Sequence, residues 1–148
     1  MPRAYEEKHH GTPSFPLQVY SHHDKDGFFF VPQHWHEELE WVYVEYGSLH
    51  LTIHGQSYAL TPGEFCFINS RELHEIKSAG ESLHHAVVFD PGFLDFSLYD
   101  NCQHNFIRPI TSGTLLFPTF CSAFPPEDHK KILFHMQKII SLMLKGAQ

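Results

Sequence analysis

The chain has 148 residues, which suits one domain with a real hydrophobic core rather than two. Its 17 acidic residues outnumber its 10 Lys and Arg residues, so this segment lacks the basic surface that direct contact with nucleic acid needs. It has no apolar run of about 18 residues, no leader-like N-terminus and only three scattered cysteines, which argues against a membrane protein or a disulfide framework and predicts a cytoplasmic location.

The first part of the chain predicts an arm followed by a barrel. Residues 1–16 combine charge with three prolines and predict an N-terminal arm that lies along a folded domain. Residues 17–90 then divide into short runs rich in Val, Ile, Phe and Tyr, separated by turn signals such as Asp26-Gly27 and Pro62-Gly63. This spacing of short strands predicts a mainly β, antiparallel barrel.

Two of the predicted strands differ in their patterns of burial. Leu49, Leu51 and Ile53 alternate with polar residues, as expected for a strand with one buried and one wetter face. The segment from Leu39 to Tyr46 is apolar at both odd and even positions. We therefore expect it to be an inner strand that is covered on both faces, by another element or by a partner subunit.

The last part of the chain predicts a connection and a helix. Residues 91–124 show little periodicity and predict an irregular connection. A helix is predicted over residues 125–148, and it begins at Pro125-Pro126-Glu127-Asp128. Its apolar residues recur at steps of three and four: Ile132, Met136, Ile139, Ile140 and Met143. This stripe must be buried on the barrel, on the same helix of a second subunit or on a helix after Gln148, and a homodimer is expected.

The candidate site is a cluster of histidines, a residue type that occurs 14 times in the chain. Gly27, His34, His36, Glu40 and Gly47 are spaced as G-x6-H-x-H-x3-E-x6-G. Residues two apart on a strand point to the same face, with Cα atoms about 6.5 Å apart, so the first two imidazoles can reach a common point. Glu40 can join them after a bend.

His74 is the fourth candidate, because the strand that leads to it can lie antiparallel to the first pair. Imidazoles and a carboxylate with open positions suit Zn, Ni, Fe or Mn, which makes His34, His36, Glu40 and His74 candidate metal ligands. The alternative is a polar pocket floor whose side chains bind a sugar or ordered water without a metal. Trp35 is a further ligand-binding candidate, because an aromatic ring can stack on a sugar.

These motifs carry a family resemblance. His34-x-His36-x3-Glu40-x6-Gly47 resembles the first cupin motif, and the segment from Gly55 to His74 resembles a looser second one, without the usual P-x-G-x-x-H ending. With Phe15-Pro16-Leu17, Pro62-Gly63-Glu64-Phe65 and Glu72-Leu73-His74, the chain resembles the N-terminal sensing domain of AraC-type transcription regulators from about Phe15 to Lys145.

The resemblance implies a cupin barrel that binds a small-molecule effector, often a sugar, followed by dimerisation helices, with no catalytic residues. It also implies that DNA is bound by a C-terminal domain that these 148 residues do not contain. Two alternatives from other classes stay open. One is a stand-alone metal-dependent cupin enzyme of the dioxygenase or isomerase type, and the other is an interaction module with neither metal nor catalysis.

Overall fold

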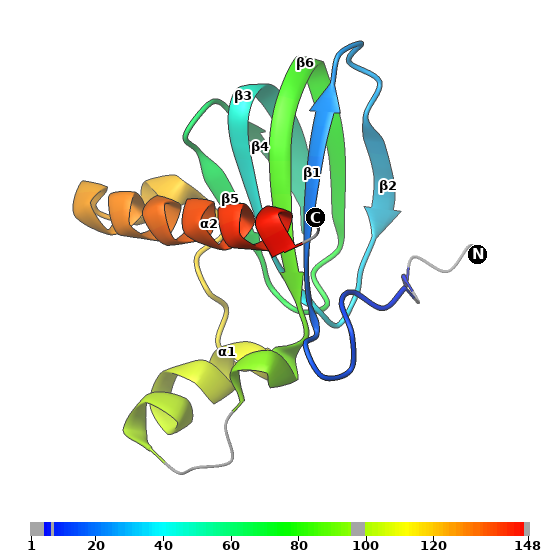
Figure 1. Ribbon diagram of the computed structural model, residues 1–148. Helices are drawn as coiled ribbons and strands as arrows, with labels where there is room; N and C mark the ends of the chain where they lie inside the picture. Colours follow the sequence, from blue (N-terminus) through cyan, green and yellow to red (C-terminus); the bar gives the residue numbers. More distant parts are fainter. Residues whose placement is uncertain (1–4, 7, 96–99, 147–148) are drawn as a thin grey trace.

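Six strands pair into one antiparallel sheet, which is strongly curved (Figure 1). The computed structural model describes residues 5–6, 8–95 and 100–146. Its two longest strands, β3 (Leu39–Ile53) and β6 (His74–Phe89), pair along most of their length. The four shorter strands pair with the ends of these two. Strands β1 (Leu17–Asp24) and β2 (Phe30–His34) pair with opposite ends of β6. Strands β4 (Gln56–Leu60) and β5 (Phe65–Ile68) pair with opposite ends of β3.

An irregularity in β3 changes which residues face the interior of the barrel. The pairing of β3 with β6 shifts between Val44 and Tyr46 and again after Gly47. At Gly47 φ is +78°, and a Cβ atom there would lie 2.0 Å from the carbonyl oxygen of Glu81. Only glycine fits this position, which explains the last residue of the spaced motif. Because of the shift, inward-facing residues are even-numbered before the bulge and odd-numbered after it.

The sheet has a hydrophobic core on each face. The inner core contains Val42 and Val44 before the bulge and Leu49, Leu51 and Ile53 after it. The outer core contains the alternate residues of the same strands, among them Leu39, Tyr43, Val87 and Phe89. The segment from Leu39 to Val44 is therefore covered on both faces as predicted, whereas Glu45 and Tyr46, at the end of the predicted range, are exposed.

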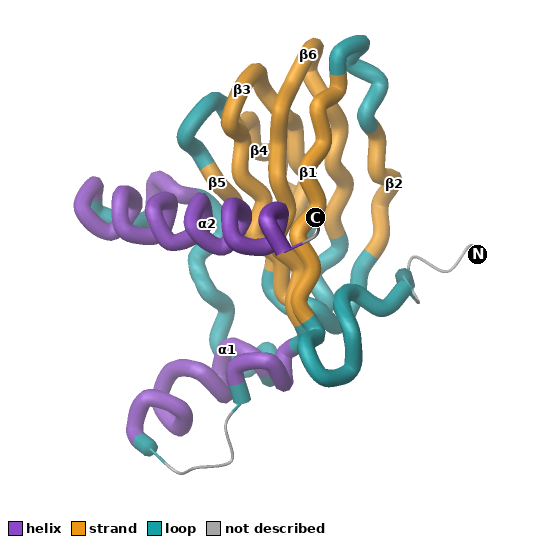
Figure 2. The backbone as a smooth tube through the Cα atoms, viewed as in Figure 1, coloured by secondary structure: helices purple, strands orange, loops and turns teal. Residues whose placement is uncertain are grey.

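The helix α2 (Pro126–Gly146) covers the outer face and runs across the strands (Figures 1 and 2). The predicted apolar stripe forms, with Met136 and Ile140 buried in the outer core and Ile132 and Met143 packed at its edge. Ile139 is the exception, since 38% of it is exposed. No helix in the described residues is long and apolar enough to cross a membrane.

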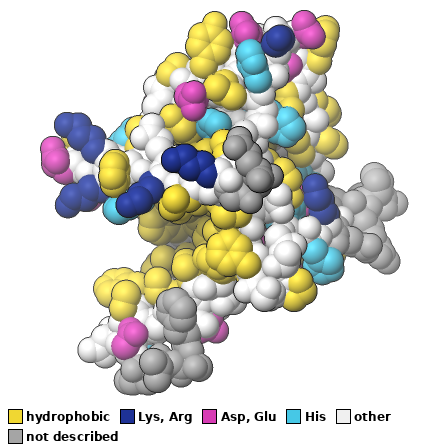
Figure 3. All heavy atoms as spheres, in the orientation of Figure 1, with side chains coloured by type: hydrophobic (Ala, Val, Ile, Leu, Met, Phe, Trp, Pro, Cys, Tyr) yellow, Lys and Arg dark blue, Asp and Glu magenta, His cyan; other side chains and the backbone are white. Residues whose placement is uncertain are grey.

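The segment between the barrel and α2 contains short helical elements that the sequence pattern does not indicate. They are η1 (Pro91–Leu94), the π-helical turn η2 (Gln103–Ile107), α1 (Arg108–Thr111) and η3 (Cys121–Ala123). Figure 3 shows hydrophobic side chains between this segment and α2. Between the segment and the outer face of the sheet, Trp41, Phe67, Ile110 and Phe117 line an apolar cavity of about 150 Å³.

The division into an arm (1–16), a barrel (17–90), a connection (91–124) and a helix (125–148) stays a prediction. Residues 1–4 and 7 of the arm and residues 147–148 of the helix lie outside the described residues.

Candidate functional site

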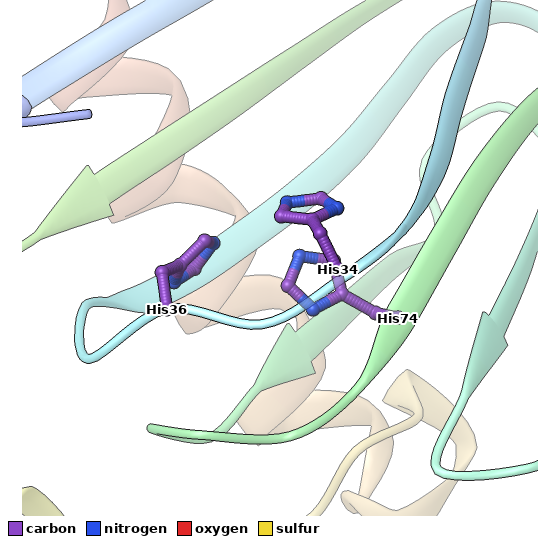
Figure 4. Close-up of side chains that lie close together, drawn as sticks. All are labelled: His34, His36 and His74. Carbon is purple, nitrogen blue, oxygen red and sulfur yellow. The ribbon is translucent and has the colours of Figure 1, made fainter. Parts of the chain in front are cut away.

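Three histidines from different parts of the chain converge at one end of the barrel (Figure 4). His34 ends β2, His36 lies in the loop before β3, and His74 begins β6, where it pairs directly with His34. One ring nitrogen of each lies within 4.8 Å of those of the other two. The structure therefore brings together three of the four ligands that the sequence spacing predicts.

Each of these imidazoles donates its Nδ1–H to a backbone carbonyl group close by in the chain. The acceptors are Pro32 for His34 at 2.9 Å, Glu38 for His36 at 3.0 Å and Glu72 for His74 at 2.8 Å. Because a carbonyl oxygen can only accept, the proton of each ring lies on Nδ1. In a neutral imidazole with its proton on Nδ1 the Nε2 lone pair is free, which is the arrangement usual for histidines that bind metals. The Nε2 of His36 also donates a hydrogen bond to the Glu40 carboxylate, so this ring would lose that proton when a metal binds.

Glu40, the fourth predicted ligand, lies against two of the imidazoles. Its Oε1 is 3.1 Å from Nε2 of His36 and 3.8 Å from Nε2 of His74. Burial alone would raise the pKa of the Glu40 carboxyl group, but the hydrogen bond with His36 and the neighbouring histidines outweigh it and lower that pKa. Burial likewise opposes protonation of His36, yet Glu40 prevails and raises the pKa of His36. Glu40 is thus a buried carboxylate.

His74 carries a buried nitrogen atom without a hydrogen-bond partner. The residue is 1% exposed, and burial lowers its pKa, so its ring is neutral. Its Nε2 has no hydrogen-bond partner among the described residues, and an unsatisfied buried polar atom costs about 1–3 kcal/mol. A divalent cation bound by His34, His36, Glu40 and His74 would supply the missing partner, and three imidazoles with one carboxylate suit Zn, Ni, Fe or Mn.

A cavity of about 180 Å³ opens next to these residues inside the barrel. Its walls are mostly apolar, with Val42, Ile76 and Val88 among them, while His34, His36 and Glu40 line its polar end. His74 lies behind them, out of contact with solvent. A small molecule in the cavity would therefore touch the candidate ligands directly.

A second group of rings also lines the cavity, and none of them is among the site residues that the spacing of the motifs predicts. His22 stacks on His84 with ring centroids 5.6 Å apart, and Phe29 lies against both. Nε2 of His84 is buried without a hydrogen-bond partner, and burial with the neighbouring His22 and His85 lowers the pKa of His84 to about 4. Strand alternation is the signal that could have placed it, since only one of the adjacent pair His84 and His85 can face inward.

The arm also contributes to the cavity. Glu6, Lys8 and His10 line it, and His10 contacts both Glu6 at 2.6 Å and the hydroxyl of Tyr20 at 2.5 Å. The hydrogen bond from His10 lowers the pKa of the Glu6 carboxyl group, so this side chain is charged. No motif in the sequence indicates these residues, because the register of an irregular arm cannot be read from periodicity.

Trp35 lies outside the cavity. It follows His34 on an extended segment, so its side chain points to the opposite face and packs on Tyr5, with ring centroids 4.6 Å apart. The ligand-binding role of Trp35 stays a prediction that the geometry does not support.

Residues 15–143 match the family described as AraC-like ligand binding domain. This match and the curved antiparallel sheet confirm the predicted cupin barrel with its C-terminal helix. The comparison with curated proteins found no match.

Among solved structures, the chain is similar to Bacillus subtilis oxalate decarboxylase, in a study of its Mn(II) centres, with 28% identity and a TM-score of 0.45 over 51% of this chain and 22% of that one. It is also similar to an RmlC-like cupin from Shewanella frigidimarina, with 20% identity and a TM-score of 0.45 over 49% and 65% of the two chains. The chain spans less than two thirds of the length of each of these structures.

Proposed function

The chain belongs to the family of AraC-like ligand binding domains, and we propose that its cavity senses a small effector beside a divalent metal ion held by His34, His36, Glu40 and His74. The domain is thus the ligand-sensing part of an AraC-type transcription regulator. The ion would fix the polar end of the effector, while the apolar walls of the barrel would enclose the rest.

The observation that carries the metal proposal is the set of three Nδ1–H hydrogen bonds to backbone carbonyl groups. They turn the Nε2 atoms of three imidazoles toward one point, and the Nε2 of His74 has no other partner there. A pocket floor that only binds water would not need the Nδ1 atoms of all three rings held by backbone carbonyl groups.

The size of the cavity supports a small effector. Its volume of about 180 Å³ is below the roughly 300–1,000 Å³ of pockets that hold drug-sized ligands. This favours a metabolite no larger than a simple sugar.

The proposed partners follow from the surface of α2. Phe134, Leu142 and Leu144 are exposed on it, at 60%, 60% and 43%, which supports a homodimer formed through this helix. We assign DNA binding to a part of the regulator other than these residues, because their net charge is −7.

The proposed coupling uses the position of the cavity between the arm and α2. Arm residues line the cavity, and α2 packs on the outer face of the same strands. An effector that prefers one arrangement of the arm or of the helix would shift the regulator toward that arrangement.

Metal analysis of protein purified without a His-tag tests the proposal. We expect about one divalent ion per chain, and His34→Ala, at a half-buried position, should weaken the affinity for that ion by at least about tenfold with the fold intact. His50→Ala is the matched control, because His50 is an exposed histidine on β3. The proposal would be contradicted if the protein bound no metal at saturating Zn²⁺, Mn²⁺, Fe²⁺ and Ni²⁺, or if the two variants bound the metal with equal affinity.

The same donor set favours a second candidate function, a metal-dependent cupin enzyme. Three imidazoles and one carboxylate leave open positions where a substrate would bind. Mass spectrometry of the effector after its release from the metal-loaded protein distinguishes the two functions. A sensor releases the effector unchanged, whereas an enzyme releases a product.

A further inference from the structure

The arm is attached to the loop that carries the candidate ligands. The backbone N–H of Glu6 donates to the carbonyl oxygen of Trp35 at 2.9 Å, and Tyr5 forms an isolated parallel bridge with Trp35. The ring of Tyr5 packs on that of Trp35. Because Trp35 lies between His34 and His36, these contacts place the side chain of Glu6 over the two imidazoles.

The carboxylate of Glu6 spans the gap between the arm and the site. Its Oε1 is 2.6 Å from Nε2 of His10, and its Oε2 is 3.6 Å from Nε2 of His34. His10 is held in turn by the hydroxyl of Tyr20. One carboxylate oxygen is therefore fixed by the arm and the barrel, while the other faces the atom that His34 offers to a metal.

Charge balance explains why a carboxylate at this position matters. A divalent ion bound by three neutral imidazoles and Glu40 carries one positive charge in excess, in a cavity with mostly apolar walls. An unpaired charge in such surroundings is costly, and the Glu6 carboxylate would neutralise it, while the ammonium group of Lys8 in the same cavity lies over the ring of Tyr20. A ligand that replaces Glu6 without a charge of its own would leave the ion unbalanced, whereas a carboxylate would restore the balance.

We propose that Glu6 is an intramolecular ligand of the His34, His36, Glu40 and His74 site, and that the effector is a small carboxylic acid that displaces it and releases the arm. This inference rests on the proposed function and adds to it the class of the effector and the contact that the effector breaks. Glu6 holds the arm closed when the effector is absent. The incoming carboxylate takes the place of the Glu6 carboxylate, so the charge of the site does not change.

The test uses the whole chain loaded with Co²⁺, whose visible absorption reports its ligands, and acetate as the probe. Glu6→Gln should change the Co²⁺ spectrum, weaken Co²⁺ binding by about tenfold and strengthen acetate binding by about tenfold, because the competing carboxylate is gone. In the unchanged protein, acetate should accelerate trypsin cleavage after Lys8, and neutral acetamide should not.

Glu38→Gln is the matched control. Glu38 also lies near His36, with its Oε1 3.9 Å from Nδ1, but it does not line the cavity. This variant removes the same charge and should keep the Co²⁺ spectrum and the acetate affinity of the unchanged protein.

The outcomes separate the two proposals. If Glu6→Gln behaves like Glu38→Gln while His34→Ala loses Co²⁺, the role of Glu6 is overturned and the metal site stands. If acetate and acetamide release the arm equally, the carboxylate class is overturned. If the unchanged protein binds no Co²⁺, both the metal site and the role of Glu6 are overturned.

Discussion

At the scale of single residues, His84 shows how the cavity is held ready for a ligand. It is 3% exposed and, within the described residues, its Nε2 has no hydrogen-bond partner, while its Nδ1 contacts the hydroxyl of Ser82 at 3.3 Å. A buried ring of this kind weakens the fold by about 1–3 kcal/mol unless something binds to it. It lines the same cavity as Glu40, which makes a polar group of the effector the natural partner.

The low pKa of His84 predicts that the protein loses stability in mild acid. The unfolded chain takes up a proton near pH 6.5, whereas folded His84 stays neutral until about pH 4, so the unfolded state binds more protons between these values. The free energy of unfolding should therefore fall as the pH drops from 6.5 to 4, with His84 contributing on the order of 2 kcal/mol after allowance for water in the cavity.

Urea unfolding at pH 7 and pH 5 gives the change in the free energy of unfolding for the unchanged protein and for His84→Gln. The variant should lose less stability than the unchanged protein over this interval, because glutamine does not titrate. Equal losses would show that His84 is protonated as easily in the folded state as in the unfolded one.

The sequence predicts the residues whose spacing is regular and misses those whose position depends on the arm. His34 and His36 are two apart, so strand geometry alone aims both at one point, and pairing of β2 with β6 adds His74. Glu6 and His10 could not be predicted, because their contacts depend on how an irregular segment folds back over the barrel. The predicted ligand-binding role of Trp35 finds no support in this geometry, because the same alternation points its ring out of the cavity and onto Tyr5.

At the scale of elements, α2 has one face on the barrel and another in solvent. The three-and-four spacing predicts the buried face, where Met136 and Ile140 are 4% and 6% exposed. The helical stretch that includes η2 and α1 has no such signal, because a π-helical turn shifts the repeat and the stretch contains Pro109.

Two substitutions on α2, each of which shortens a side chain, should affect different properties of the protein. Met136→Ala leaves a cavity in the outer core and should lower the free energy of unfolding by about 2–3 kcal/mol. Leu142→Ala, at a position that is 60% exposed, should change it by less than about 0.5 kcal/mol but weaken self-association by about tenfold.

Urea unfolding and sedimentation equilibrium check the two effects separately. Both substitutions remove a large side chain from the same helix, so a difference in helix propensity does not account for the contrast. If Leu142→Ala destabilises the chain as much as Met136→Ala does, the exposed face of α2 is not a surface for a second copy.

At the scale of the whole molecule, the proposed metal site joins segments that are far apart in the sequence. Its candidate ligands come from β2, the loop after it, β3 and β6. An ion that binds these ligands only in the folded chain stabilises the fold as a whole, by about 2.7 kcal/mol at a free metal concentration 100 times the Kd.

Calorimetry should therefore show a rise in Tm of about 5–10 °C on addition of Zn²⁺ or Mn²⁺, reversed by a chelator. His50→Ala should keep this rise and His34→Ala should lose it. An unchanged Tm in the unchanged protein at saturating metal would mean that the histidines bind no ion in the folded state.

A single layer of β-sheet separates the cavity from α2. Val88 of β6 faces the cavity, while its neighbours Val87 and Phe89 are part of the outer core on which Met136 and Ile140 pack. Consecutive residues of a strand are joined by rigid peptide planes, and each residue advances the strand by about 3.3 Å. A shift of the residues on the inner face of the sheet therefore also shifts their neighbours on the outer face. We therefore expect an effector that pushes on Val88 to shift the strand on which α2 packs, so that the helix responds to the size of the effector rather than to a chain of polar contacts.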